Sequence, residues 1–345
     1  MRIVVVGATG NVGTSLLEAL ERDDAVTSVL GLARRRPQTA RAKTEFAVAD
    51  VTRDDLVGHF RGADCVVHLA WLIQPSRDEA TLWRTNVEGS SRVFAAVAEA
   101  GVPALVVASS VGAYSPGPKR RVDESWRARG VATSWYGRQK GEVERRLDVF
   151  EAEHPAIRVA RLRPALIMKR EAAEEVRRLF FGPLLPSALV RPGRLPLVPH
   201  IPGLVVQVLH SRDAGQAYRL AATRDVRGAF NVATEPELDG RRLAAAIGAR
   251  ALPVPRRVAR VLASLTWRLR LQPTSPDWVD LGLRTPLLDT RRARDELGWK
   301  PAADAVGTVR ELLLGLSEQA GGPTPPLRPG GRGEEIGAGV GEKPV

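Results

Sequence analysis

The sequence contains a single cysteine, Cys65, so the chain cannot form an internal disulfide bond. A protein without disulfides fits the reducing cytoplasm. The sequence also lacks any apolar run near the ~20 residues that a membrane-spanning helix needs, and it begins without the pattern of a cleavable signal peptide. We therefore expect a cytoplasmic protein without a membrane span.

Lysine is also scarce, because only six of the 51 cationic residues are Lys. The formal net charge is +12, but the cations occur in scattered doublets and triplets instead of one block. The sequence has no ladder of aromatic and basic residues and no recognisable nucleic-acid-binding module. We therefore expect positive charge spread over the surface, without a specific nucleic-acid partner. The five histidines are dispersed and none is paired at metal-ligand spacing, so we expect no metal site.

Apolar residues make up 44% of the 345 positions, enough for one large domain or two coupled ones. Up to about residue 165, short apolar runs rich in Val and Leu alternate with amphipathic stretches. This alternation predicts an α/β fold with a doubly wound parallel sheet of the Rossmann type. The predicted strands lie at residues 3–6, 28–32, 45–49, 65–69, 104–108 and 157–162.

Beyond residue 165, Pro and Gly become frequent, which predicts irregular loops over a pocket. We expect residues 1–165 to form the nucleotide-binding domain, with the chain returning to it within 205–235. Residues 166–318 would then form the substrate-binding region. Residues 319–345 are mostly Gly, Pro and charged residues, which predicts a disordered tail.

A basic amphipathic stretch at residues 256–270 carries Val258, Val261, Leu262, Leu265 and Leu269 on one helical face. Such a helix can lie on an anionic membrane. We expect instead that this face packs onto its own domain.

The first strand runs directly into three glycines, in the sequence MRIVVVGATGNVG. Gly7 permits a sharp turn, Gly10 lets the backbone approach a pyrophosphate, and Gly13 lets helix and strand pack closely. The helix that follows directs unpaired N–H groups and the positive end of its dipole at the phosphates. Cofactor contacts are expected from Gly7, Thr9, Gly10, Asn11, Val12 and Gly13.

The ends of the next strands supply the other predicted cofactor contacts. Arg34 and Arg35 follow the second strand, where a carboxylate would bind the adenosine ribose and repel a 2′-phosphate. Their guanidinium groups can bind that phosphate, which favours NADP over NAD, unless the run is only basic surface. The third strand ends at Asp50 and Val51, where a carboxylate can accept a hydrogen bond from the exocyclic amine of adenine. The fourth strand ends at Leu69 and Ala70.

The candidate catalytic pair is Tyr136 and Lys140, four residues apart and therefore on one face of a predicted helix. A phenol has an ordinary pKa of ~10, and lowering it to about 7 takes about 4 kcal/mol. A nearby ammonium group and an oxidised nicotinamide can supply that much in a partly dry cleft. The phenol can then exchange a proton with a substrate hydroxyl as hydride moves. Ser110, with Ser109 as the alternative, would donate to the substrate oxygen.

Taken in order, these segments resemble the extended short-chain dehydrogenase/reductases, also called the NAD-dependent epimerase/dehydratase family. The resemblance covers roughly residues 1–316. It implies a Rossmann-type domain, a smaller C-terminal α/β substrate domain, a Ser110–Tyr136–Lys140 active site and pairing into a homodimer. Asn86 would support the helix beneath the cofactor, and Ala108, Tyr136, Lys140 and Pro164 would be further cofactor contacts. The segments that carry the resemblance are GATGNVG, Asp50-Val51, HLA at 68–70, NVEG at 86–89, ASS at 108–110, Tyr136-x-x-x-Lys140 and Arg163-Pro164.

The sequence departs from the sugar-nucleotide members of that family at two places. Residues 163–169 lack their Asn and Gly, and Val205, Val206 and Gln207 stand near the position where they place an Arg for the substrate pyrophosphate. An unmet charge is costly in a closed site. The departures favour a smaller or more apolar carbonyl or alcohol, in a pocket lined by Trp71, Ser109, Val111 and Ile167.

The sequence therefore predicts an NAD(P)-dependent oxidoreductase that moves hydride between nicotinamide and a secondary alcohol or ketone. Two alternatives stay open. One is a sugar-nucleotide epimerase or dehydratase that keeps NAD tightly bound. The other is a cofactor-sensing or RNA-associated protein that has kept the fold without turnover, since fold alone does not define function.

Overall fold

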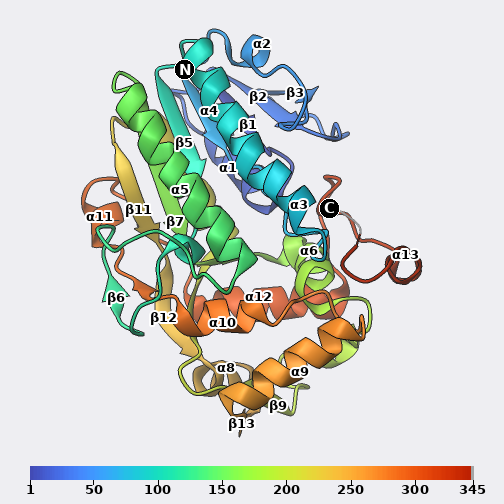
Figure 1. Cartoon of the computed structure of the whole chain (residues 1–345). Coiled ribbons are helices and arrows are strands. Elements are labelled where there is room, and N and C mark those ends of the chain that lie inside the picture. The colour runs from blue at the N-terminus through green and yellow to red at the C-terminus, as the bar shows by residue number, and fades with distance from the viewer. Residues whose placement is uncertain (343–345) are drawn as a thin grey trace.

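The computed structural model describes residues 1–342, and at its centre lies a seven-stranded parallel sheet (Figure 1). The strands are ordered β11-β7-β5-β4-β1-β2-β3. The predicted doubly wound Rossmann-type sheet is confirmed. Its strands are β1 (Arg2–Val6), β2 (Ser28–Ala33), β3 (Thr44–Val48), β4 (Cys65–His68), β5 (Ala104–Ala108), β7 (Arg158–Pro164) and β11 (Gly228–Val232).

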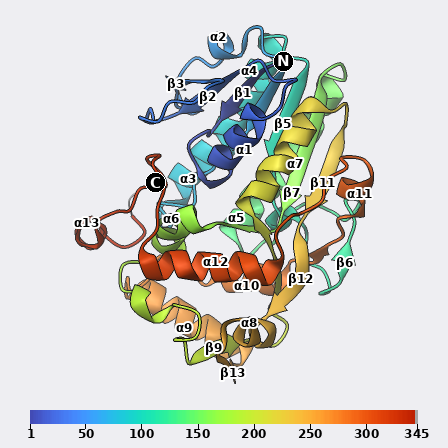
Figure 2. The ribbon, with the colours of Figure 1, turned by 180° about the vertical axis from the view of Figure 1, so that it is seen from behind.

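Helices cover both faces of the sheet because alternate residues of each strand point to opposite sides. Ile3 and Val5 of β1 belong to one core cluster, whereas Val4 and Val6 belong to another. On the first face lie α1 (Asn11–Glu21) and α7 (Ser211–Thr223), which are nearest the viewer in Figure 2. On the other face lie α2 (Val57–Phe60), α4 (Gly89–Glu99) and α5 (Trp135–Glu153).

The register of the strands brings their carboxyl ends to a common edge. Val6 at the end of β1 pairs with Leu32 of β2 and with His68 of β4. The strand order reverses at β1, since β2 lies on one side of it and β4 on the other. Open α/β sheets bind their ligands at such a switch point, beyond the carboxyl ends of the strands.

Most of the remaining chain forms smaller sheets and helices below this edge, whereas α11 lies beside β11 (Figure 1). One sheet contains β8 (Leu166–Met168), β10 (Val205–His210) and β12 (Thr234–Asp239), and two strand pairs join β9 (Leu197–His200) to β13 (Arg250–Pro253) and β6 (Arg121–Val122) to β14 (Leu287–Leu288). The helices are α3 (Glu79–Trp83), α6 (Ala173–Val176), α8 (Gly240–Ile247), α9 (Arg256–Arg268), α10 (Asp277–Arg284), α11 (Arg291–Asp295), α12 (Ala305–Glu318) and α13 (Arg332–Ala338). Within residues 1–342, no helix is long and apolar enough to cross a bilayer.

The prediction that the apolar face of residues 256–270 packs onto its own domain is wrong. No residue of α9 is buried, and its five predicted face residues are between 46% and 67% exposed. The half-buried side chains are instead those of Trp267 and of smaller residues, including Ala259, Ala263 and Ser264. The helical periodicity identifies the apolar face but not which side of the helix contacts the rest of the protein.

The segment after residue 318 differs from the predicted disordered tail. The Thr324 hydroxyl donates to the Thr9 carbonyl of the glycine loop over 2.7 Å, and the Leu327 side chain is buried. Farther along, the Arg177 guanidinium forms an ion pair with Glu335 of α13. These anchors are single polar or apolar contacts to distant residues, so composition alone did not reveal them. The last part of the predicted tail, residues 343–345, lies outside the described residues.

Candidate active site

A cavity of about 670 Å³ lies at the carboxyl edge of the main sheet, at the switch point between β1 and its neighbours. With the exception of Asn86, every residue predicted for the site lines it. They are Gly7, Thr9, Gly10, Asn11, Val12, Gly13, Arg34, Arg35, Asp50, Val51, Leu69, Ala70, Trp71, Ala108, Ser109, Ser110, Val111, Tyr136, Lys140, Pro164 and Ile167.

The glycine loop fits the phosphates of a dinucleotide. Gly7 has a φ of 88°, and a Cβ there would lie 2.7 Å from the Ala70 nitrogen, so no other residue suits this turn. By contrast, a Cβ on Gly10 would meet only the Gly7 carbonyl, at 3.8 Å, which leaves the backbone open to a ligand. No side chain caps the start of α1, and the Asn11 Oδ1 atom is buried without a hydrogen-bond partner. The first N–H groups of α1 and this amide oxygen are therefore available at the cavity wall.

Charged groups flank the cavity at the ends of β2 and β3. The side chains of Arg34 and Arg35 are exposed and line the cavity beside Asp50. Burial opposes ionisation of Asp50, but hydrogen bonds from the Thr52 backbone and hydroxyl hold the pKa of this carboxyl below its usual value. The end of the cavity formed by β2 and β3 thus offers two cations and one carboxylate.

Tyr136, Lys140 and Ser110 meet where α5 passes the end of β5. The Ser134 side chain caps α5 by accepting from the Gly137 N–H, so Tyr136 stands in the first helical turn and Lys140 in the next. The Ser110 side chain hydrogen-bonds the Tyr136 hydroxyl. The Lys140 ammonium donates to the Ala108 carbonyl over 2.8 Å and lies 3.5 Å from the centre of the Trp71 ring.

Burial has the largest effect on the pKa values of Tyr136 and Lys140. It raises the pKa of Tyr136 to about 12, although the Ser110 hydrogen bond opposes the rise. Burial also lowers the pKa of Lys140 to about 7, against the attraction of Glu144. The protein's own groups therefore keep the phenol protonated at neutral pH. The lowering of the phenol pKa that the sequence led us to expect would have to come from the positive charge of an oxidised nicotinamide.

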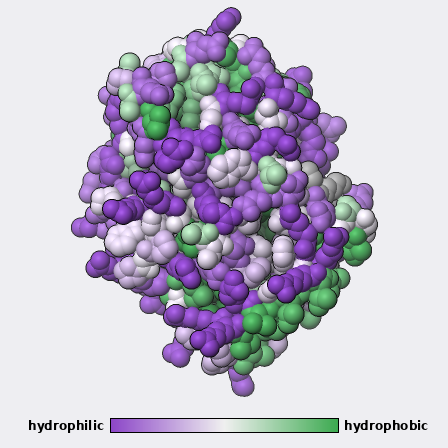
Figure 3. Space-filling model, in the orientation of Figure 1, coloured by the Kyte–Doolittle hydropathy of each residue, from purple (hydrophilic) through white to green (hydrophobic). Residues whose placement is uncertain are grey.

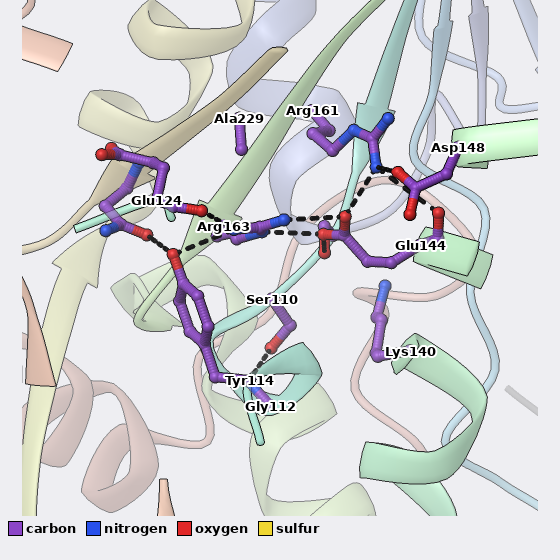
Figure 4. A network of polar contacts seen from close by, with 12 residues as sticks. Ser110, Gly112, Tyr114, Glu124, Lys140, Glu144, Asp148, Arg161, Arg163 and Ala229 are labelled. Carbon is purple, nitrogen blue, oxygen red and sulfur yellow. Dashed lines mark hydrogen bonds and ion pairs between the residues drawn. The ribbon is translucent and has the colours of Figure 1, made fainter. Parts of the chain in front are cut away.

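A buried ion-pair network around Glu144 lies beside Lys140 and Ser110 (Figure 4). Glu144 accepts hydrogen bonds from Arg163 Nε at 2.8 Å and from Arg161 Nη1 at 2.9 Å, and all three side chains are less than a tenth exposed. Burial opposes the charge on Glu144, but Arg163 and then Arg161 hold the pKa of this carboxyl at about 2. Ser109 donates its hydroxyl to the same carboxylate over 2.5 Å. Ser109 is thus engaged on Glu144, which leaves Ser110 beside the phenol.

The sequence analysis missed this network, although a signal for it was present. Tyr136, Lys140 and Glu144 are spaced by four residues each, which places all three on one face of α5. Arg161 and Arg163 alternate with apolar residues along β7, so both point to that same side of the sheet.

Asn86 was expected both to support the helix beneath the cofactor and to be a cofactor contact, and the structure does not place it at the cavity. Its side chain is fully buried and does not line the cavity. The amide accepts from the Leu72 N–H at 2.7 Å and donates to the Leu72 carbonyl at 2.9 Å and to Gln139 at 2.8 Å. Asn86 therefore fixes the chain just after Trp71 to α5.

The end of the cavity away from the glycine loop is aromatic and apolar. The Tyr136 ring lies 5.0 Å from the Trp278 ring and 5.8 Å from the Trp71 ring, measured between centres. Phe180 packs edge-on against Trp278. The sequence analysis also missed Glu175, which lines this cavity and whose pKa burial raises to about 7.

Comparisons with known proteins agree with this geometry. The family model described as "NAD dependent epimerase/dehydratase family" matches residues 3–233. An uncharacterised protein of Mycobacterium tuberculosis is 28% identical over 324 residues, an alignment that covers 93% of this chain and 31% of the relative. The chain therefore spans about a third of the length of that relative. An L-arabinose 1-dehydrogenase (NAD(P)(+)) of Haloferax volcanii is 34% identical over 110 residues, which cover 32% of this chain and 41% of that enzyme.

A solved structure resembles the whole fold. It is a UDP-glucose-4-epimerase from Stenotrophomonas maltophila with bound NAD and formylated UDP-arabinopyranose. The TM-score is 0.69 at 21% sequence identity, over 92% of this chain and 98% of that one. At this identity the likeness extends to the fold and not to the substrate.

Proposed function

The chain belongs to the NAD-dependent epimerase/dehydratase family, and on that premise we propose that it is an NAD(P)-dependent oxidoreductase for a secondary alcohol or ketone. The observation that carries the proposal is the meeting of Ser110, Tyr136 and Lys140 in one cavity with the glycine loop. The apolar end of the same cavity would hold the substrate.

The residues divide the work as follows. The glycine loop and the start of α1 would bind the pyrophosphate, and Arg34 and Arg35 the adenosine end. When bound, the nicotinamide ring supplies or accepts the hydride. The hydroxyls of Ser110 and Tyr136 would bind the substrate oxygen, and Tyr136 would pass its proton to that oxygen as a ketone is reduced. Lys140 would stabilise the phenolate that remains.

The charges around the cavity support a small or apolar substrate over a sugar nucleotide. Among the described residues that line it, the cations are Arg34, Arg35 and Lys140, all assigned here to the cofactor or to proton transfer. The lining residue Glu175 is an acid that would repel a diphosphate when ionised. A diphosphate without a cation partner loses its hydration at a cost that nothing here offsets.

A second candidate is a sugar-nucleotide epimerase or dehydratase that keeps NAD bound through each turnover. The observation in its favour is the likeness over nearly the whole chain to an epimerase structure that holds NAD and a UDP-sugar.

Cofactor exchange separates the two candidates. We expect the purified protein to lose its cofactor on gel filtration and to consume added NADPH or NADH with a panel of ketones. Retention of one NAD per chain, together with turnover of UDP-glucose and no net change in cofactor redox state, would establish the second candidate in place of the first.

The cofactor preference rests on Arg34 and Arg35. We expect the double variant Arg34→Gln/Arg35→Gln to weaken NADPH binding at least about tenfold, because each charge-assisted bond to a 2′-phosphate is worth about 1.5–3 kcal/mol. NADH binding should change little. Calorimetric titration with both cofactors measures the difference.

Arg36→Gln is the matched control, because Arg36 belongs to the same exposed triplet but does not line the cavity. Equal losses of NADPH and NADH affinity in the double variant would contradict a 2′-phosphate site.

A further inference from the structure

The helix α9 presents its large apolar side chains to solvent. Val258, Val261, Leu262, Leu265 and Leu269 form a continuous face that is about half exposed along its length. Figure 3 shows this face as a hydrophobic patch at the lower right, where Figure 1 draws α9. The helix turns Trp267 and several small residues toward the body, while its large aliphatic side chains stay in solvent, which is the reverse of a helix that buries its aliphatic face in its own domain. An exposed apolar patch of this kind marks a docking surface.

Cations border this face. Arg257 stands four residues before Val261, and Arg268 stands three residues after Leu265, so both lie along one edge of the face. The helix itself contains no Asp or Glu. Arg260 pairs with Asp280 of α10, but among residues 1–342 Arg257 and Arg268 form no ion pair.

The combination of apolar face and basic edge identifies the occupant. We propose that α9 docks onto an anionic lipid bilayer, with its apolar face in the interface and Arg257 and Arg268 on lipid phosphates. A second copy of the chain fits less well, because two such helices face to face would bring their arginines together without a carboxylate on either. At 13 residues, α9 is also too short to cross a bilayer.

The same apolar surface continues to the active-site cavity. Leu271, just beyond α9, is exposed, and in the segment that follows it the Thr274 hydroxyl donates to the Phe180 carbonyl. The neighbouring Phe181 is 45% exposed and also lines the cavity. Docking would therefore bring this side of the cavity close to the bilayer. The docking itself does not depend on the proposed function, since it is measured without turnover.

Vesicle sedimentation tests the proposal with the full chain. We expect the protein to sediment with vesicles of phosphatidylglycerol and phosphatidylcholine, and far less with phosphatidylcholine alone or at high salt. The variant Leu262→Gln/Leu265→Gln should bind at least about tenfold more weakly, because both side chains would enter the interface. The variant Arg257→Gln/Arg268→Gln should lose most of the preference for the anionic vesicles.

Two control variants match these changes at other exposed sites. Val48→Gln/Val149→Gln removes equally exposed apolar side chains, and Arg22→Gln/Arg36→Gln removes two exposed cations. Both controls should sediment as the unchanged protein does. Absence of vesicle binding overturns the proposal, and so does a dimer in analytical ultracentrifugation that Leu262→Gln/Leu265→Gln dissociates while vesicle binding stays unaltered.

Discussion

Replacing Tyr136 by Phe is expected to lower turnover by at least about two orders of magnitude, the usual contribution of a general acid or base. The variant removes only the hydroxyl that hydrogen-bonds Ser110 and leaves the ring between Trp71 and Trp278. Cofactor affinity should therefore stay nearly unchanged, because the glycine loop and the start of α1 are untouched. Steady-state kinetics and cofactor titration measure the two effects separately.

Tyr218→Phe is the control for this prediction, because Tyr218 is a buried tyrosine in the wall of the same cavity. It should retain nearly full turnover. Unaltered turnover in Tyr136→Phe would remove the phenol from the mechanism.

The pH dependence gives an independent test of the same role. Because the pKa of Tyr136 lies at about 12 in the protein, the phenolate is a minor species near neutrality and its fraction rises about tenfold per pH unit. Oxidation of an alcohol needs the phenolate, so log kcat/KM should rise with pH at a slope near one. The rise should level off at the pKa of the phenol, which the charge of an oxidised nicotinamide lowers. Reduction of a ketone needs the protonated phenol and should be flat across the same range. A flat profile in the oxidation direction would contradict proton transfer to Tyr136.

The sequence predicted those parts of the molecule that depend on local pattern. Alternating apolar runs gave the strands of the main sheet, and the glycine spacing gave the turn at Gly7, because both follow from neighbours within a few residues. Parallel strands bring their carboxyl ends to one edge, so residues as distant as Asp50, Ser110 and Tyr136 could be assigned to one cavity before their distances were known.

The features that sequence did not predict depend on long-range contacts. The amphipathic pattern of α9 defines an apolar face but does not say whether that face meets protein, lipid or water. Thr324 reaches the glycine loop across more than three hundred residues through a single hydroxyl. Glu144 was overlooked because a carboxylate on a helix is usually solvated, and only the partner strand β7 reveals that it is buried against two arginines.

The largest effect on stability is expected at Glu144. We predict that Glu144→Gln lowers the free energy of unfolding by about 3 kcal/mol, because it leaves Arg161 and Arg163 buried without this carboxylate. Glu142→Gln is the control, two residues earlier on α5 with a more exposed pairing to Arg145, and should cost less than about 1 kcal/mol. Urea unfolding followed by circular dichroism measures both.

The pKa of Glu144 sets the direction of the accompanying pH effect. Since the folded pKa of about 2 lies below the ordinary value of 4.5, this contribution is complete above the unfolded pKa and is lost as pH falls toward 2. The difference in stability between Glu144→Gln and the unchanged protein should therefore shrink as the pH is lowered through this window. A difference that stays constant, or a cost no larger than that of Glu142→Gln, would mean that the charge on Glu144 does not stabilise the fold through Arg161 and Arg163.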